Sequence, residues 1–138
     1  MKERKIIIAT HGTLADGFCS ALKIITGATN IQTLCCYLMP DFNLEKAIDE
    51  LFADYDPKKE EVFVFTDLLG GSVNNGFIKA MKNKDFHLIT NSSLGLLIDF
   101  IVTNESVEDL KKKLSSSQFQ AIYCNDVISN CTGIDEDI

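Results

Sequence analysis

The sequence predicts an α/β fold with a mainly parallel, doubly wound sheet flanked by helices. Strand-like runs alternate with segments of helical periodicity along the chain. Residues 5–10 form a short β-branched run, typical of a central strand buried on both faces. The chain has 138 residues, of which 46% are hydrophobic, so it can build one well-buried core. We therefore expect a single domain over residues 1–138.

The first half of the chain continues with a helix, a strand and a second helix. Apolar residues at helical spacing predict a helix over 14–26, which Gly27 is suited to end. A strand is expected over 32–38. Asn43 is suited to cap a helix over 44–55, because the apolar residues of that segment fall on one face.

The second half repeats the pattern. Residues 61–66 (EVFVFT) form the clearest strand, and Ser72 is placed to cap a helix over 73–81. A fourth strand is expected over 86–90 and a fourth helix over 94–103. The alternation of strand and helix favours parallel pairing throughout.

Three features remain at the end of the chain. Ser106 and Asp109 resemble a capping box that opens a last helix. Residues 120–124 are the candidate for a final strand. The polar and acidic segment from about residue 130 is expected to fray.

Charge and apolar run lengths exclude several kinds of partner. The net charge is −7, which disfavours nucleic acid and anionic membranes because both require a basic footprint. No apolar run approaches the roughly 20 residues that cross a bilayer, and the basic start precedes too short a run for a secretory signal. We expect a cytoplasmic protein. Arg4 is the only arginine, so a phosphate site elsewhere in the chain has no guanidinium of its own.

The cysteines predict neither disulfides nor a metal site. Their number is odd, and no C-x-x-C pair is present. Cys35 and Cys36 are adjacent in an expected strand, so their side chains point to opposite faces. We expect all five to be reduced thiols that pack as small apolar groups. They are Cys19, Cys35, Cys36, Cys124 and Cys131.

Reactive side chains follow three of the expected strands. Ligands of open α/β sheets bind beyond the carboxyl ends of the strands. The first strand ends in Thr10-His11, the third in Asp67 followed by Gly70-Gly71-Ser72, and the fourth in residues 90–93. If the first and third strands are neighbours, His11 and Asp67 lie within hydrogen-bonding reach.

These residue types suit phosphoryl transfer through a histidine. A histidine nucleophile needs one bare ring nitrogen, and a carboxylate bound to the other N–H fixes that tautomer. Backbone N–H groups of Gly70 and Gly71, the Ser72 hydroxyl and the following helix terminus can hold phosphoryl oxygens.

Each residue also has a purely structural interpretation. His11 can be a structural histidine, and Asp67 can simply begin a turn. Gly70-Gly71-Ser72 can be an ordinary strand-to-helix turn with a cap. His87, inside an apolar strand pattern, is interpreted as structural.

Two segments resemble a known family. ATHGTLADGF (residues 9–18) and VFVFTDLLGGSVNN (residues 62–75) resemble the IIA domain of the mannose-type (mannose/fructose/sorbose) family of the phosphoenolpyruvate-dependent sugar phosphotransferase system. The order and spacing of the motifs agree over residues 5–126.

The resemblance implies a function and an assembly. It implies that His11 accepts a phosphoryl group from the histidine phosphocarrier protein and donates it to a IIB subunit, which serves the membrane IIC and IID subunits. It implies that Asp67 orients the histidine, that Ser72, Thr10 and the two glycines lie by the phosphate, and that no cofactor or metal takes part. It further implies a homodimer that exchanges a C-terminal antiparallel edge strand, for which residues 120–124 are the candidate. IIB is then expected on a separate polypeptide.

The chain departs from the family pattern at two places. Leu69 and Val73 flank Gly-Gly-Ser where the family often has an aromatic residue and a proline. Asn91 is followed by Ser92 instead of the frequent proline. Both departures bear on which IIB partner and which sugar are served.

Three other functions are compatible with parts of the pattern. Ser72, His11 and Asp67 are the residue types of a hydrolase triad, although Gly70-Gly71-Ser72-Val73-Asn74 is not a G-x-S-x-G elbow. A receiver phosphorylated on Asp67 lacks the further acidic residues that hold magnesium after the first strand. A regulatory phosphoprotein of the same fold can share the whole site.

Overall fold

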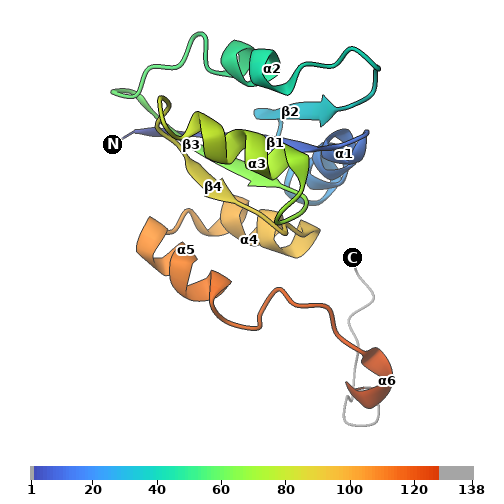
Figure 1. Ribbon diagram of the computed structural model, residues 1–138. Helices are drawn as coiled ribbons and strands as arrows, with labels where there is room; N and C mark the ends of the chain where they lie inside the picture. The colour runs from blue at the N-terminus through green and yellow to red at the C-terminus, as the bar shows by residue number, and fades with distance from the viewer. Residues whose placement is uncertain (1, 128–138) are drawn as a thin grey trace.

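The computed structural model describes residues 2–127, which form a four-stranded sheet covered by helices on both faces (Figure 1). The strand order is β2-β1-β3-β4, and every pairing is parallel. The strands are β1 (Glu3–His11), β2 (Ile31–Cys36), β3 (Glu60–Thr66) and β4 (His87–Ile89). The prediction of a parallel, doubly wound α/β fold is confirmed.

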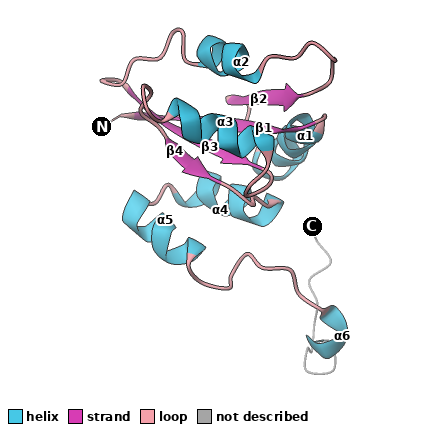
Figure 2. Cartoon of the chain, viewed as in Figure 1, coloured by secondary structure: helices cyan, strands magenta, loops and turns pink. Residues whose placement is uncertain are grey.

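Residues 2–127 also form six helices (Figure 2). The first four each follow one strand, and the last two follow the fourth helix. They are α1 (Leu14–Thr26), α2 (Leu44–Leu51), α3 (Ser72–Ala80), α4 (Leu94–Thr103), α5 (Val107–Leu114) and α6 (Cys124–Val127). Helices α2 and α3 pack on one face of the sheet, and α1, α4 and α5 contribute to the core on the other. No helix in residues 2–127 is long and apolar enough to cross a membrane.

The central strand β3 contributes side chains to the hydrophobic cores on both faces of the sheet. Val62 and Val64 belong to the cluster under α2 and α3, whereas Phe63 and Phe65 belong to the cluster under α1 and α4. Successive side chains of a strand point to opposite faces, so a continuous apolar run is what a strand covered on both sides requires. Burying each of these side chains contributes about 1.5–3 kcal/mol.

Most helix ends follow the expected local chemistry. Gly27 ends α1 in the left-handed conformation, with φ of 77°. The Asn43 side chain caps α2 by accepting the Lys46 N–H, and Ser106 caps α5 by accepting the Asp109 N–H. Helix α2 is shorter than predicted, because the chain leaves it at Phe52 in a series of tight turns.

The predicted capping role of Ser72 is wrong. Gly71 occupies the N-cap position, with extended backbone angles, and Ser72 is the first helical residue. The N-cap therefore has no side-chain oxygen, and the Ser72 hydroxyl points to a different partner, described below.

The predicted strand over 120–124 is also absent from the chain as described. Residues 121–123 have no regular structure, and α6 begins at Cys124. The segment leads away from the sheet (Figure 1), so no strand edge lies beside it to supply hydrogen bonds. Cys131 and the acidic segment from about residue 130 lie outside the described residues.

The amino end of the sheet holds Arg4 and His87. The Arg4 guanidinium lies over the rings of Phe63 and Phe100, 5.0 and 4.9 Å from their centroids, and donates to the backbone carbonyl of Glu105. His87 stacks on Phe63 at 4.5 Å and lies 3.1 Å from a Glu61 carboxylate oxygen. These contacts support the structural interpretation of His87.

Candidate functional site

The candidate site lies at the carboxyl ends of β1 and β3. His11 is the last residue of β1, and Asp67 directly follows β3. Because β1 and β3 are paired in parallel, the two residues meet, as predicted. Asp67 Oδ2 lies 2.9 Å from His11 Nδ1 and accepts the His11 backbone N–H, also at 2.9 Å. One carboxylate oxygen thus fixes both the ring and the backbone of His11.

The contact with Asp67 determines which nitrogen of His11 is available. An ionised carboxylate can only accept a hydrogen bond. Nδ1 therefore carries the hydrogen, and Nε2 keeps a bare lone pair. Ser72 Oγ lies 3.4 Å from Nε2, and the His11 side chain is 42% exposed. The bare nitrogen is therefore accessible and adjoins the amino end of α3.

Asp67 is ionised in this environment. Burial raises the pKa of its carboxyl, but hydrogen bonds from the His11 backbone N–H, the His11 ring and its own loop outweigh burial. The net result is a pKa below the ordinary value of 3.8. The charged form is the one that can stabilise a cationic imidazole.

The glycines let the loop after β3 approach His11 closely. Gly70 has φ of 78°, a conformation that favours glycine. A Cβ on Gly71 would lie 3.2 Å from the Leu68 carbonyl oxygen and 3.4 Å from His11 Cε1. The loop ends in the first turn of α3, whose N–H groups and dipole favour an anion beside Nε2.

Two asparagines hold this loop from its flanks. Asn91 Oδ1 accepts the Leu69 N–H at 3.0 Å, and the Asn75 amide donates to the Gly70 carbonyl at 3.2 Å. Asn91 belongs to the third polar segment that the sequence placed at this edge. Asn75 was missed, because nothing in a helix-forming run indicates that its side chain turns back to the preceding loop.

Tyr37 was also missed by sequence reasoning. Its ring centroid lies 5.6 Å from that of His11, with 30° between the planes, and its edge contacts Phe42 at 5.1 Å. Tyr37 has φ of 65°, which costs a non-glycine residue about 1–2 kcal/mol. The turn directly after β2 brings the ring to the site, and no sequence signal marks a tyrosine for that conformation.

Thr10 lies apart from the exposed atoms of the site. Its side chain is fully buried, and its hydroxyl accepts the Ala15 N–H at 2.7 Å. In this structure Thr10 anchors the start of α1. It therefore positions the segment after His11, and its predicted contact with phosphate stays a prediction.

The cysteine nearest the site is not a competing nucleophile. Burial raises the pKa of the Cys36 thiol to about 12, with smaller contributions from the Asp67 charge and from Cys35. The four described cysteines are free thiols: Cys19, Cys35, Cys36 and Cys124. Cys36 is buried as predicted, but the predicted apolar packing is wrong for Cys124, which is exposed because its segment lies away from the sheet.

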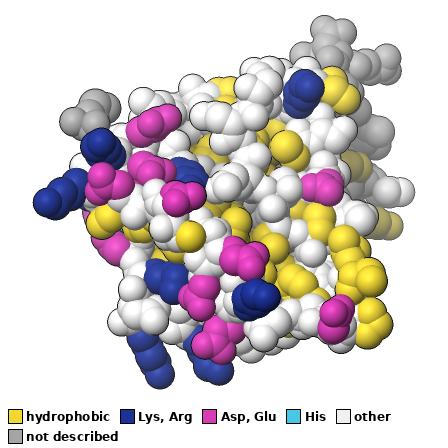
Figure 3. Space-filling view, turned by 90° about the horizontal axis from the view of Figure 1, so that it is seen from above, with side chains coloured by type: hydrophobic (Ala, Val, Ile, Leu, Met, Phe, Trp, Pro, Cys, Tyr) yellow, Lys and Arg dark blue, Asp and Glu magenta, His cyan; other side chains and the backbone are white. Residues whose placement is uncertain are grey.

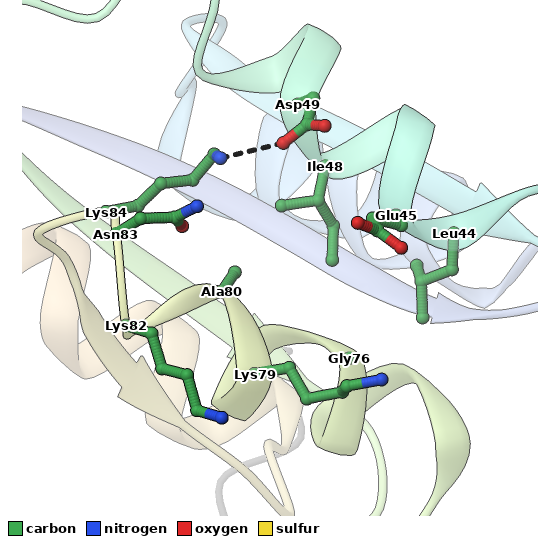
Figure 4. A pocket seen from close by; sticks show the side chains of 10 residues that line it. All are labelled: Leu44, Glu45, Ile48, Asp49, Gly76, Lys79, Ala80, Lys82, Asn83 and Lys84. Atoms are coloured by element: carbon green, nitrogen blue, oxygen red, sulfur yellow. Dashed lines mark hydrogen bonds and ion pairs between the residues drawn. The ribbon is translucent and has the colours of Figure 1, made fainter.

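A separate hollow lies between α2 and α3. It has a volume of about 310 Å³, and Figure 4 shows Lys84 reaching across it to Asp49, at 2.7 Å. Gly76 forms part of its wall. None of the residues lining the hollow belongs to the His11 site.

Comparison with known proteins identifies the class to which this fold and site belong. Residues 5–117 match the family model of the PTS system fructose IIA component. The chain therefore belongs to the mannose/fructose family of IIA components of the sugar phosphotransferase system. None of the curated proteins matches the sequence significantly.

Solved structures agree with this family. The chain is 31% identical to a candidate phosphoenolpyruvate-dependent sugar phosphotransferase system permease from Klebsiella pneumoniae, with a TM-score of 0.80 over 92% of this chain and 95% of that one. It is 27% identical to the PTS IIA protein associated with the fucose utilization operon of Streptococcus pneumoniae, with a TM-score of 0.70 and coverage of 92% and 97%. It is 25% identical to the phosphotransferase component EIIA of Streptococcus agalactiae, with a TM-score of 0.70 and coverage of 93% and 99%.

Proposed function

We propose that this protein is a cytoplasmic phosphoryl carrier that takes a phosphoryl group on His11 Nε2 from the histidine phosphocarrier protein. It passes the group to a separate IIB subunit, which serves the membrane IIC and IID subunits in sugar uptake. The observation that carries the proposal is the alignment of Asp67, the His11 ring and Ser72, which leaves Nε2 bare and accessible. We expect the single predicted domain, residues 1–138, to carry out this function.

The transfer step needs no proton to move at His11. The Nε2 lone pair attacks phosphorus, the P–N bond of the donor phosphohistidine breaks, and its electron pair returns to the donor nitrogen. The Nδ1 hydrogen stays bound to His11, so the imidazole becomes cationic. The ionised Asp67, 2.9 Å from Nδ1, stabilises that charge. Donation to IIB reverses these steps.

Neutral donors of this chain are suited to hold the phosphoryl oxygens. Ser72 offers a hydroxyl beside Nε2, and the first turn of α3 offers N–H groups. Arg4, the only arginine in the chain, lies at the other end of β1. These donors carry no formal positive charge, so release of the group to the next carrier breaks hydrogen bonds but no ion pair with an arginine.

The surface around His11 supports a protein partner. Hydrophobic side chains gather on the right of Figure 3, toward the carboxyl ends of the strands, whereas most charged side chains lie on the left. We name six exposed apolar residues the apolar rim: Leu14, Tyr37, Leu38, Met39, Leu68 and Leu69. Exposed apolar side chains clustered about a functional group are typical of a docking surface.

The free edge of β4 supports the homodimer. A groove of about 510 Å³ runs beside β4 and is lined in part by Thr90 and Phe119. Within the described residues Thr90 Oγ1 is buried without a hydrogen-bond partner. An added strand supplies main-chain partners along such an edge. Residues 120–124 of a second copy are the proposed strand.

The experiment that tests the carrier function is intact-mass analysis after incubation with phosphoenolpyruvate, the general phosphotransferase enzyme and the phosphocarrier protein. We expect one phosphoryl adduct that is labile in acid and absent from His11→Ala. An equally labelled variant, or a folded wild type without an adduct, contradicts the proposal.

A hydrolase is the second candidate, because Asp67, His11 and Ser72 lie in the order of a catalytic triad. Ser72→Ala separates the two functions. A carrier loses one oxygen ligand and is labelled more slowly, whereas a hydrolase loses its nucleophile and all its activity. Loss of all His11 labelling in this variant would count against the carrier. A regulatory phosphoprotein would be labelled on His11 but would not pass the group to IIB.

A further inference from the structure

We propose that Tyr37 is a positioning residue for His11, whose ring supports the face of the imidazole and stabilises the positive charge that phosphorylation creates. The inference rests on the proposed function and adds to it a residue that acts through His11. It comes from a strained backbone position and from the contact that this position produces.

The position of the ring follows from the end of β2. The Gly12 N–H donates to the Cys36 carbonyl at 2.9 Å, which ties the residue after His11 to the last residue of β2. The chain turns at the next residue, Tyr37, and its ring comes to 5.6 Å from the imidazole, tilted by 30°. Phe42 contacts the tyrosine ring at 5.1 Å and 70°, so the ring is held from a second side.

The residue type is unexpected for this backbone conformation. Three non-glycine residues among those described have positive φ, and the other two are asparagines, Asn91 at 53° and Asn104 at 46°. Asparagine tolerates this region because its short side chain can bond to the local backbone, whereas tyrosine has no such compensation. Strained positions of this kind concentrate at functional sites. The ring at Tyr37 must therefore contribute something that an asparagine there would not.

The contact with His11 supplies that contribution. Asp67 and Ser72 approach the two ring nitrogens, at 2.9 and 3.4 Å, whereas the Tyr37 ring lies beside the imidazole with 30° between the two planes. The tyrosine ring restricts rotation of the imidazole out of the Asp67–Ser72 line. Once Nε2 is phosphorylated the imidazole is cationic, and an aromatic face attracts a cation within about 6 Å of its centroid. Tyr37 thus favours the phosphorylated state.

Three variants test whether the aromatic ring of Tyr37 is what affects His11. Tyr37→Phe keeps the ring. Tyr37→Asn removes it and suits the backbone, so the variant should unfold no more easily than wild type. Ile24→Asn is the control, because it replaces an apolar side chain that is 82% exposed and lies near the far end of α1, outside the site and the apolar rim. The phosphoryl donor is phosphoramidate, a small molecule that needs no protein docking.

We expect Tyr37→Asn to be labelled roughly tenfold more slowly at His11, the loss that corresponds to one aromatic contact. Tyr37→Phe and Ile24→Asn should keep the wild-type rate. The ring protons of unphosphorylated His11 should shift in the NMR spectrum of Tyr37→Asn and not of Tyr37→Phe, because only the former loses the ring current.

Equal rates for wild type and Tyr37→Asn overturn the inference, as does an equal loss in Ile24→Asn or in Tyr37→Phe. The proposed function fails separately, if the phosphocarrier protein does not label wild-type His11.

Discussion

At the scale of single residues, the site is a histidine whose ring is contacted by three other side chains. Asp67 binds Nδ1 and the backbone of the same residue, Ser72 adjoins Nε2, and the Tyr37 ring lies beside the imidazole. For the proposed phosphoryl transfer, this arrangement holds the imidazole in place in advance, so little reorganisation is needed.

Replacing Asp67 by asparagine should slow labelling of His11 by at least about 100-fold, because an amide that donates to Nδ1 forces the proton onto Nε2 and removes the lone pair. The rate of phosphoryl transfer from the phosphocarrier protein measures the effect. Asp41→Asn is the control, since Asp41 is exposed and lies outside the site. Similar rates for both variants would show that the Asp67 charge is not needed.

Asp67 also makes the stability of the protein depend on pH. Its pKa in the folded protein is below the ordinary value of 3.8, so ionisation stabilises the fold above that value. The contribution is lost as the pH falls through the folded pKa. We expect the free energy of unfolding of wild type to exceed that of Asp67→Asn near neutral pH by more than it does near pH 3 or below. Urea unfolding at both pH values measures it, and a constant difference would contradict the interpretation.

At the scale of elements, a close contact between two helices explains a glycine in the middle of one of them. Helices α2 and α3 pack closely where Gly76 faces Leu44, and a Cβ built on Gly76 would lie 2.4 Å from Leu44 Cδ2. Glycine costs a helix about 1 kcal/mol relative to alanine, so close packing must compensate for it here. The glycine is thus explained by helix packing and not by catalysis.

The two helical glycines should therefore respond oppositely to alanine. Gly76→Ala should destabilise the protein by about 1 kcal/mol, because Leu44 must leave its position. Gly17→Ala in α1 should stabilise it by about 0.5–1 kcal/mol, since a Cβ there meets nothing within 4 Å. Denaturant unfolding measures both. In a Leu44→Ala background Gly76→Ala should become stabilising, and an unchanged penalty there would show that Leu44 is not the cause.

At the scale of the whole molecule, the face drawn in Figure 3 has its hydrophobic side chains gathered toward the carboxyl ends of the strands and most of its charged side chains toward the other end. The apolar rim lies at the carboxyl ends, near His11. Under the proposed function, we expect partner choice to rest on the loops after β2 and β3, including Leu69, where the chain departs from the family pattern.

Leu69→Ser should raise the concentration of phosphocarrier protein needed for half-maximal labelling by about five- to tenfold, with little change in the rate at saturation. Leu69 is 70% exposed in the apolar rim. Ile24→Ser is the control, because Ile24 is 82% exposed but lies near the far end of α1. An equal effect of both variants would argue against docking on the rim.

The dimer can be tested through the backbone of residues 120–124. In an added strand, only every second N–H group points to the partner strand. One of the two variants Ile122→Pro and Tyr123→Pro should therefore remove a hydrogen bond to β4 and shift the protein toward monomer. Sedimentation analysis measures the shift. Ile122→Ser keeps the N–H and should stay dimeric. A wild type that sediments as a monomer would contradict the dimer itself.

The sequence by itself determined the order of the elements up to α5, the parallel sheet and the position of His11 and Asp67 at strand ends. These follow from local patterns: apolar period, caps such as Asn43, and polar residues at strand ends. That His11 and Asp67 meet depended on β1 and β3 being neighbours, which the structure decided. Element ends were displaced by a few residues, and Ser72 was misassigned as a cap, because glycine at position 71 can take the N-cap angles without a side chain.

Only the tertiary structure decided which other residues surround the histidine. Tyr37 reaches the site through the turn after β2, and Asn75 reaches back from α3 to the preceding loop. Neither direction is recorded in a linear pattern. The same reason applies to residues 120–124, which were predicted as a strand and do not form one in the described chain. A strand forms where an edge is available, and the position of an edge is a property of the assembled sheet.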